Sequence, residues 1–127
     1  MNAGDTFLIP LPGTSLDSHL WMVISDPMRD PEHVVLVNLT SWRADKDQAC
    51  IVLPGDHPYL TKKSCVNFRG SKVQRVSDLE SLLTSGQLTS HAPLSTALLA
   101  RIRCAVADSR MPLEHAAILA DQGLVGF

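Results

Sequence analysis

Few cysteines and no long hydrophobic run are present in the sequence, and each shortage excludes a class of protein. The three cysteines, Cys50, Cys65 and Cys104, include no C-x-x-C pair, which argues against a disulfide framework and favours a reducing compartment, the cytoplasm. No apolar stretch approaches the roughly 20 residues of a membrane span. The N-terminus has no basic region before its short apolar run, so the sequence predicts neither a secretion signal nor a membrane contact.

The sequence also lacks a large excess of either charge and glycine-rich motifs. The chain has 11 basic and 13 acidic residues, a formal net charge of -2. A nucleic acid would therefore have to bind a local basic patch, because the overall field does not attract it. The 7 glycines form no phosphate-loop or dinucleotide-binding pattern, so no cofactor is expected.

The composition is that of one folded domain. The 127 residues are 45% hydrophobic and 19% charged, which excludes a disordered chain, and we expect a single domain over residues 1–127. Short apolar runs separated by turn residues predict barrel strands over residues 4–76, and the most apolar run is expected at the centre of the sheet. The strand candidates are Thr6–Ile9, His19–Ser25, His33–Leu39 (the most apolar), Cys50–Leu53, Cys65–Phe68 and Lys72–Val76.

Helical periodicity begins near Ser77, and residues 77–127 are expected to be the helical part. Ser77 and Glu80 have the spacing of a capping box. Strands followed by helices are an α+β order, and the short connections predict a small SH3-like antiparallel β-barrel with C-terminal helices. The expected helices, with their start and stop signals, are Ser77 to Gly86, Ser95 to Asp108 and Pro112 to Gly123.

Several short motifs follow one another in an order shared with a known family. They are Gly4-Asp5, Leu20–Ser25, Val35–Ser41, Lys63–Phe68 and Gly86–Leu88 followed by Leu94–Ile102. Together, over residues 4–106, they resemble the MazF/PemK family of toxin endoribonucleases. The resemblance implies a metal-independent toxin of a toxin-antitoxin system that cleaves single-stranded RNA. It also implies a homodimer and an antitoxin protein as partner.

One residue of the family pattern is missing. Family members carry Arg-Pro just before the second strand, and that arginine is catalytic, whereas this chain has Ser18-His19 there. Either His19 has taken the place of the arginine, or the chain is a divergent relative whose cleavage chemistry is altered or lost. The alternative function is therefore a non-catalytic module that binds RNA or a protein partner.

Residues suited to cleave RNA without a metal are present. The reaction needs a base, an acid, and groups that stabilise a charged phosphorane. His57 and His19 can exchange protons near neutral pH. Thr40 and Ser41 can donate hydroxyl hydrogen bonds, and Lys63 can neutralise a phosphate. These five are the predicted catalytic residues, and His57 is the strongest candidate because it lies in a polar loop that we expect to be exposed. The predicted RNA-binding residues are Lys62, Arg69 and Lys72.

Each of these residues also has a purely structural interpretation. His19 fits a half-buried rim position and His57 a turn, while Thr40-Ser41 could only end a strand. The basic cluster could be a solvated face. The spacings Cys50–His57 and His57–Cys65, seven and eight residues, match no zinc pattern, so no metal site is predicted and both cysteines are expected in the core.

Overall fold

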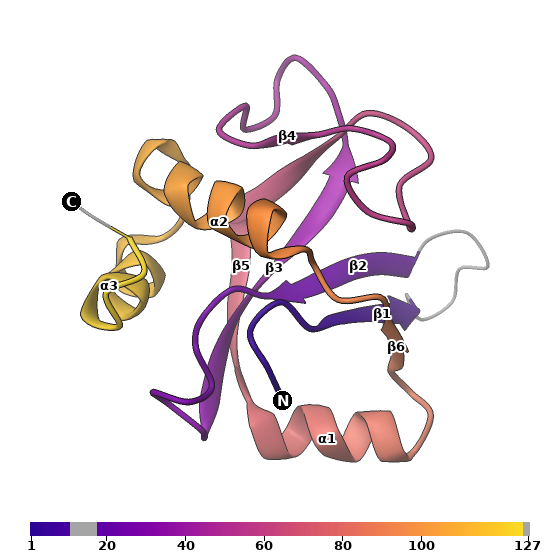
Figure 1. The fold of residues 1–127 in the computed structure, drawn as a ribbon, viewed down its shortest axis with the longest axis vertical. Helices are drawn as coiled ribbons and strands as arrows, with labels where there is room; N and C mark the ends of the chain where they lie inside the picture. The colour runs from indigo at the N-terminus through magenta and orange to yellow at the C-terminus, as the bar shows by residue number, and fades with distance from the viewer. Residues whose placement is uncertain (11–17, 126–127) are drawn as a thin grey trace.

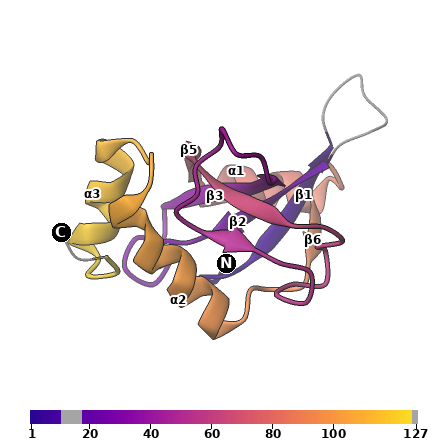
Figure 2. The ribbon, with the colours of Figure 1, turned by 90° about the horizontal axis from the view of Figure 1, so that it is seen from above.

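One antiparallel sheet forms the centre of the molecule, and it curls into a half-barrel (Figures 1 and 2). The computed structural model describes residues 1–10 and 18–125. The 6 strands lie in the order β4-β5-β3-β2-β1-β6, and every neighbouring pair is antiparallel, which confirms the α+β prediction. The elements are β1 (Thr6–Pro10), β2 (Ser18–Val23), β3 (His33–Ser41), β4 (Ile51–Val52), β5 (Ser64–Arg75), α1 (Val76–Thr84), β6 (Thr89–His91), α2 (Thr96–Ala105), the 3₁₀ turn η1 (Val106–Asp108) and α3 (Leu113–Asp121).

The apolar run expected at the centre of the sheet is β3, and this prediction is confirmed. Because successive side chains of a strand point to opposite faces, β3 contributes to two apolar layers. Val34 and Leu36 pack in the layer that α1 covers, whereas Val35 and Val37 pack in the layer that includes Ile102 of α2. Each large side chain buried in this way contributes about 1.5–3 kcal/mol of transfer free energy.

A bulge interrupts the pairing of β3 with β5. Asn38 pairs with Asn67, but Leu36, two residues earlier, pairs with Lys72, so four residues of β5 lie opposite one residue of β3. The Gly70 N–H donates to Asn67 Oδ1 (3.0 Å), and a Cβ at Gly70 would clash with the Asn67 amide. The prediction of two separate strands here is wrong, because the glycine allows a bulge inside one long strand.

The capping box predicted from Ser77 and Glu80 is also wrong. α1 begins one residue earlier, at Val76, and Arg75 precedes it without a side-chain capping hydrogen bond. Val76 is buried, and its N–H donates to the Glu32 carbonyl oxygen (2.9 Å). The chain therefore passes directly from β5 into α1, and tertiary packing overrides the local capping signal.

The C-terminal part combines helices with one strand. Ser95 Oγ accepts a hydrogen bond from the Leu98 N–H (3.1 Å), which confirms the predicted start of α2. The α-helix ends at Ala105, before η1, rather than continuing to Asp108 as predicted. β6 lies within the range expected to be helical and pairs with β1. In the described ranges, 1–10 and 18–125, no helix is long and apolar enough to cross a membrane.

Candidate functional site

Four of the predicted site residues meet at one shallow depression of about 240 Å³. They are His19 from β2, Thr40 and Ser41 from β3, and Lys62 from the loop before β5. The β2–β3 register pairs Trp21 with Asn38, so two residues further along the strands His19 comes to lie beside Thr40. Strand pairing thus brings together side chains that are about twenty residues apart in the sequence.

His19 has one ring nitrogen bound to the chain. Its Nδ1 lies 3.3 Å from the Leu39 carbonyl oxygen. A carbonyl oxygen only accepts hydrogen bonds, so Nδ1 is the donor and carries the proton in the neutral ring. The lone pair is then on Nε2, the nitrogen that can take a proton from a substrate. The ring is half-buried, which also fits the structural interpretation of His19 as a rim residue.

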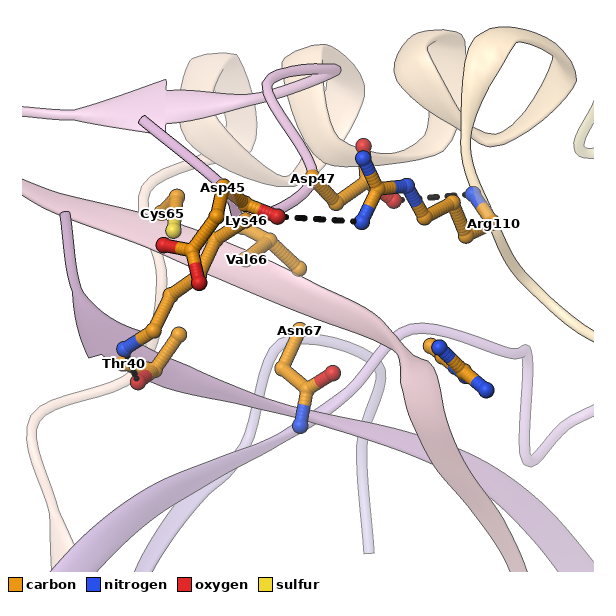
Figure 3. Close-up of a pocket in the computed structure, with 9 residues that line it drawn as sticks. Thr40, Asp45, Lys46, Asp47, Cys65, Val66, Asn67 and Arg110 are labelled. Atoms are coloured by element: carbon orange, nitrogen blue, oxygen red, sulfur yellow. Dashed lines mark hydrogen bonds between the residues drawn. The ribbon is translucent and has the colours of Figure 1, made fainter. Parts of the chain in front are cut away.

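Lys46 is a site residue that the sequence analysis missed. Lys46 lies in the loop that follows β3, and its Nζ donates to Thr40 Oγ1 (2.6 Å; Figure 3). The same Nζ donates to the Ser41 carbonyl oxygen (2.8 Å). In the sequence Lys46 stands between Asp45 and Asp47, where its charge looks locally neutralised. Its proximity to the end of β3 was the only available signal.

Thr40 also borders a second pocket, of about 210 Å³, which Lys46 lines as well (Figure 3). Arg69, one of the predicted RNA-binding residues, lines this pocket together with Arg110. The Arg110 backbone N–H donates to Asp47 Oδ2 (2.8 Å), and its guanidinium donates to the Asp45 carbonyl oxygen (3.3 Å). The pocket therefore mixes cations with carboxylates, and its field is weaker than its arginines suggest.

The other two predicted basic residues do not line the depression, and each lies over an indole ring. Lys63 Nζ is 4.1 Å from the centre of the Trp42 ring, and Lys72 Nζ is 5.9 Å from the centre of the Trp21 ring. Neither lysine lines either of the two pockets described above. The basic residues that are close in sequence are therefore divided among separate places on the surface.

His57 is buried, with 3% of its surface exposed, so the prediction that it lies in an exposed loop is wrong. Its Nε2 lies 2.6 Å from the Ala92 carbonyl oxygen and donates to it, and its Nδ1 accepts the Tyr59 backbone N–H (3.1 Å). The His91 ring packs against it, with ring centres 5.4 Å apart. Both ring nitrogens are thus occupied, and His57 does not line the depression that contains His19.

An ion pair holds the same loop against α2. The Arg101 guanidinium lies 3.4 Å from Asp56 and donates to the Ile51 carbonyl oxygen (2.8 Å). The Leu53 N–H, which donates to Asp56, and then the charge of Arg101 lower the pKa of the Asp56 carboxyl. Together with His57, these contacts fix the loop that carries Lys62 at the edge of the depression.

Two of the three cysteines, Cys50 and Cys65, are poor nucleophiles in this fold. Cys50 and Cys65 are buried, as predicted, and Cys104 is exposed. Burial raises the pKa of the Cys50 and Cys65 thiols, despite the opposing charges of Arg101 and Lys46 respectively. A protonated thiol is neither a good nucleophile nor a metal ligand. Within the described ranges no group of three or more His, Cys, Asp or Glu side chains could hold a metal ion.

Comparison of the sequence with protein-family models and with curated proteins finds no match. The chemistry of the depression is therefore the basis for a function. It offers one imidazole ring, two hydroxyl groups and an ammonium group. A base, hydrogen-bond donors and a cation are three of the groups that attack of a ribose 2′-hydroxyl on phosphorus requires.

Proposed function

We propose that the protein is a metal-independent endoribonuclease toxin that cleaves single-stranded RNA, similar to MazF/PemK proteins. The observation that carries the proposal is the meeting of His19, Thr40, Ser41 and Lys62 at one depression. We infer that His19 takes the part of the catalytic arginine, which the resembled family carries just before its second strand, where this chain has Ser18-His19. We also infer that the curled half-barrel is a variant of the SH3-like barrel of that family, acting in the cytoplasm.

In the proposed mechanism, His19 Nε2 takes the proton of a ribose 2′-hydroxyl. The 2′ oxygen then bonds to the adjacent phosphorus, and the bond from phosphorus to the 5′ oxygen breaks. Water supplies a proton to the leaving 5′ oxygen, and the products are a 2′,3′-cyclic phosphate and a 5′-hydroxyl end. The Lys62 ammonium offsets the charge that develops on the phosphorane.

Lys46 orients the Thr40 hydroxyl so that it can donate a hydrogen bond to the scissile phosphate. Because Lys46 Nζ donates to Thr40 Oγ1, that oxygen is already an acceptor, and the hydroxyl proton remains for a phosphoryl oxygen. A hydroxyl polarised by a cation is also a stronger donor. Lys46 is therefore a positioning residue, whereas Thr40 and Ser41 contact the phosphate.

Purified protein should cleave single-stranded RNA in the presence of EDTA, because no metal takes part in the proposed steps. Gel analysis of a labelled oligoribonucleotide measures the cleavage, and mass spectrometry identifies the cyclic phosphate. Protein with His19→Ala, prepared in the same way, controls for a contaminating nuclease. Complete loss of cleavage in EDTA, restored by one divalent ion, would contradict the mechanism.

The second candidate is a non-catalytic module that binds RNA or a protein partner. One observation in its favour is that His57 is held by hydrogen bonds to Ala92 and Tyr59, so His19 is the single histidine that lines the depression. The other is that the sequence lacks the arginine of the family pattern. The same gel separates the two candidates. Wild-type protein that binds the oligoribonucleotide without cutting it would establish the binding module.

We further propose a homodimer, which the resemblance implies, with an antitoxin protein as the physiological partner. The outermost strands, β4 and β6, have 2 and 3 residues, so a second copy has to cover surface other than a long strand edge. Static light scattering at tens of micromolar should give twice the chain mass of 13.8 kDa. A mass equal to one chain would rule out a dimeric RNA groove.

A further inference from the structure

We propose that Trp42 and Lys63 bind one nucleotide of a single-stranded RNA beside the depression, the base on the indole ring and the phosphate at the ammonium group. This inference rests on the proposed function and adds a binding position to it. Trp42 is 37% exposed, an unusual exposure for so large an apolar side chain. Lys63 Nζ lies over one face of the ring, 4.1 Å from its centre, so a positive charge borders the indole and the base stacks on the face that the ammonium group does not cover.

Although exposed, Trp42 is held firmly. Its Nε1–H donates to Gln48 Oε1 (2.7 Å), and its backbone N–H donates to the Lys63 carbonyl oxygen (3.1 Å). The Gln48 amide in turn donates to the carbonyl oxygens of Arg43 (2.8 Å) and Lys46 (2.6 Å). A ring whose orientation is fixed before binding loses little entropy when a base stacks on it, which favours affinity.

The position of the ring relates it to the proposed cleavage site. Ser41 and Lys62 line the depression. Trp42 directly follows Ser41 in the sequence, and Lys63 directly follows Lys62. The hydrogen bond from the Trp42 N–H to the Lys63 carbonyl oxygen continues the β3–β5 pairing past Ser41 and Ser64. A strand whose scissile phosphate lies in the depression therefore has a neighbouring nucleotide within reach of the ring.

The other tryptophan shows what a core indole looks like in this fold. Trp21 is 8% exposed and packs in the layer that α1 covers, and Lys72 lies over its ring at 5.9 Å. Trp42, by contrast, belongs to neither of the two buried clusters. Its burial therefore contributes little to folding, and its fixed orientation calls for another explanation. Stacking on an indole accepts every base, so the position should bind RNA without strong sequence preference.

Fluorescence titration with an RNA oligonucleotide carrying 2′-O-methyl riboses tests this inference. Such RNA has no 2′ proton to lose, so binding is measured without cleavage. We expect the oligonucleotide to quench the wild-type fluorescence and the quenching to disappear in Trp42→Phe, which leaves only the buried Trp21. Trp42→Ala should bind about 5- to 150-fold more weakly, the size of one lost base stack, whereas Trp42→Phe, which keeps an aromatic ring but loses the hydrogen bond to Gln48, should bind with an affinity between those of Trp42→Ala and wild type.

The possible outcomes separate this inference from the proposed function. Equal affinity of wild type and Trp42→Ala, or quenching that persists in Trp42→Phe, would overturn the nucleotide position and leave the ribonuclease proposal standing. Binding that depends on Trp42, with no cleavage of ordinary RNA by wild type, would support the position and overturn the ribonuclease. Absence of any binding by wild type would overturn both. If Trp42→Ala does not fold, the quenching difference between wild type and Trp42→Phe decides alone.

Discussion

Replacing His19 with alanine should lower the rate of RNA cleavage by about 10²–10⁴-fold, the usual size of a lost general base. The reason is that Nε2 is the proposed proton acceptor. It keeps the lone pair because Nδ1 donates to the Leu39 carbonyl oxygen. Folding should be little affected, because the ring is half-buried and its hydrogen bond, at 3.3 Å, is long. The measurement is single-turnover cleavage of a labelled oligoribonucleotide, with circular dichroism to confirm the fold.

Two further variants make the His19 result specific. His33→Ala removes an exposed histidine at the opposite end of β3 and should leave the cleavage rate unchanged. Lys62→Ala should weaken RNA binding and reduce its salt dependence by about one ion, as loss of a phosphate contact does. If His19→Ala folds normally and cleaves as fast as wild type, His19 is not the base, and the binding module becomes the better description.

The positions of most strands could be predicted because turn residues mark their ends. Pro27 after β2 and the apolar centre of β3 are local signals, and the register that follows from them brings His19 to Thr40. The bulge in β5 could not be recognised in the same way. Gly70 looks like a turn between two strands, and only its contact with Asn67 shows that the strand continues.

The environments of His57 and Lys46 depend on side-chain contacts that local sequence patterns do not report. His57 stands in a polar sequence among glycine and prolines, yet its burial arises from Ala92, 35 residues away. Lys46 is flanked by two aspartates, yet its side chain reaches the end of β3. β6 was missed for a related reason. It has 3 residues, and its pairing with β1 is not visible in its own polar sequence.

Replacing His57 with alanine should destabilise the domain by about 2–4 kcal/mol. Two causes add together: the hydrogen bonds of His57 to the Ala92 carbonyl oxygen and from the Tyr59 N–H are lost, although Thr6 Oγ1 still donates to Ala92 (2.7 Å), and a cavity is left beside His91. Each lost hydrogen bond costs about 0.5–1.5 kcal/mol, and truncating a large buried side chain adds a further cavity term. Because small domains are stable by only about 5–15 kcal/mol, a loss of this size is easily measured.

Urea denaturation followed by circular dichroism gives the free energy of unfolding, and His33→Ala is the matched control. His33 is exposed, and its backbone N–H, which alanine retains, donates to Asp30 Oδ1 (3.1 Å). Its truncation should therefore change the free energy of unfolding by at most about 0.5 kcal/mol. The cleavage rate, measured under conditions in which His57→Ala is still fully folded, shows whether His57 is a structural residue or takes part in proton transfer. A structural residue lowers stability and leaves the cleavage rate of the folded protein within a few-fold of wild type. If His57→Ala is instead as stable as wild type but cleaves about 10²–10⁴-fold more slowly, His57 takes part in the proton transfers and must leave its contact with Ala92 to do so.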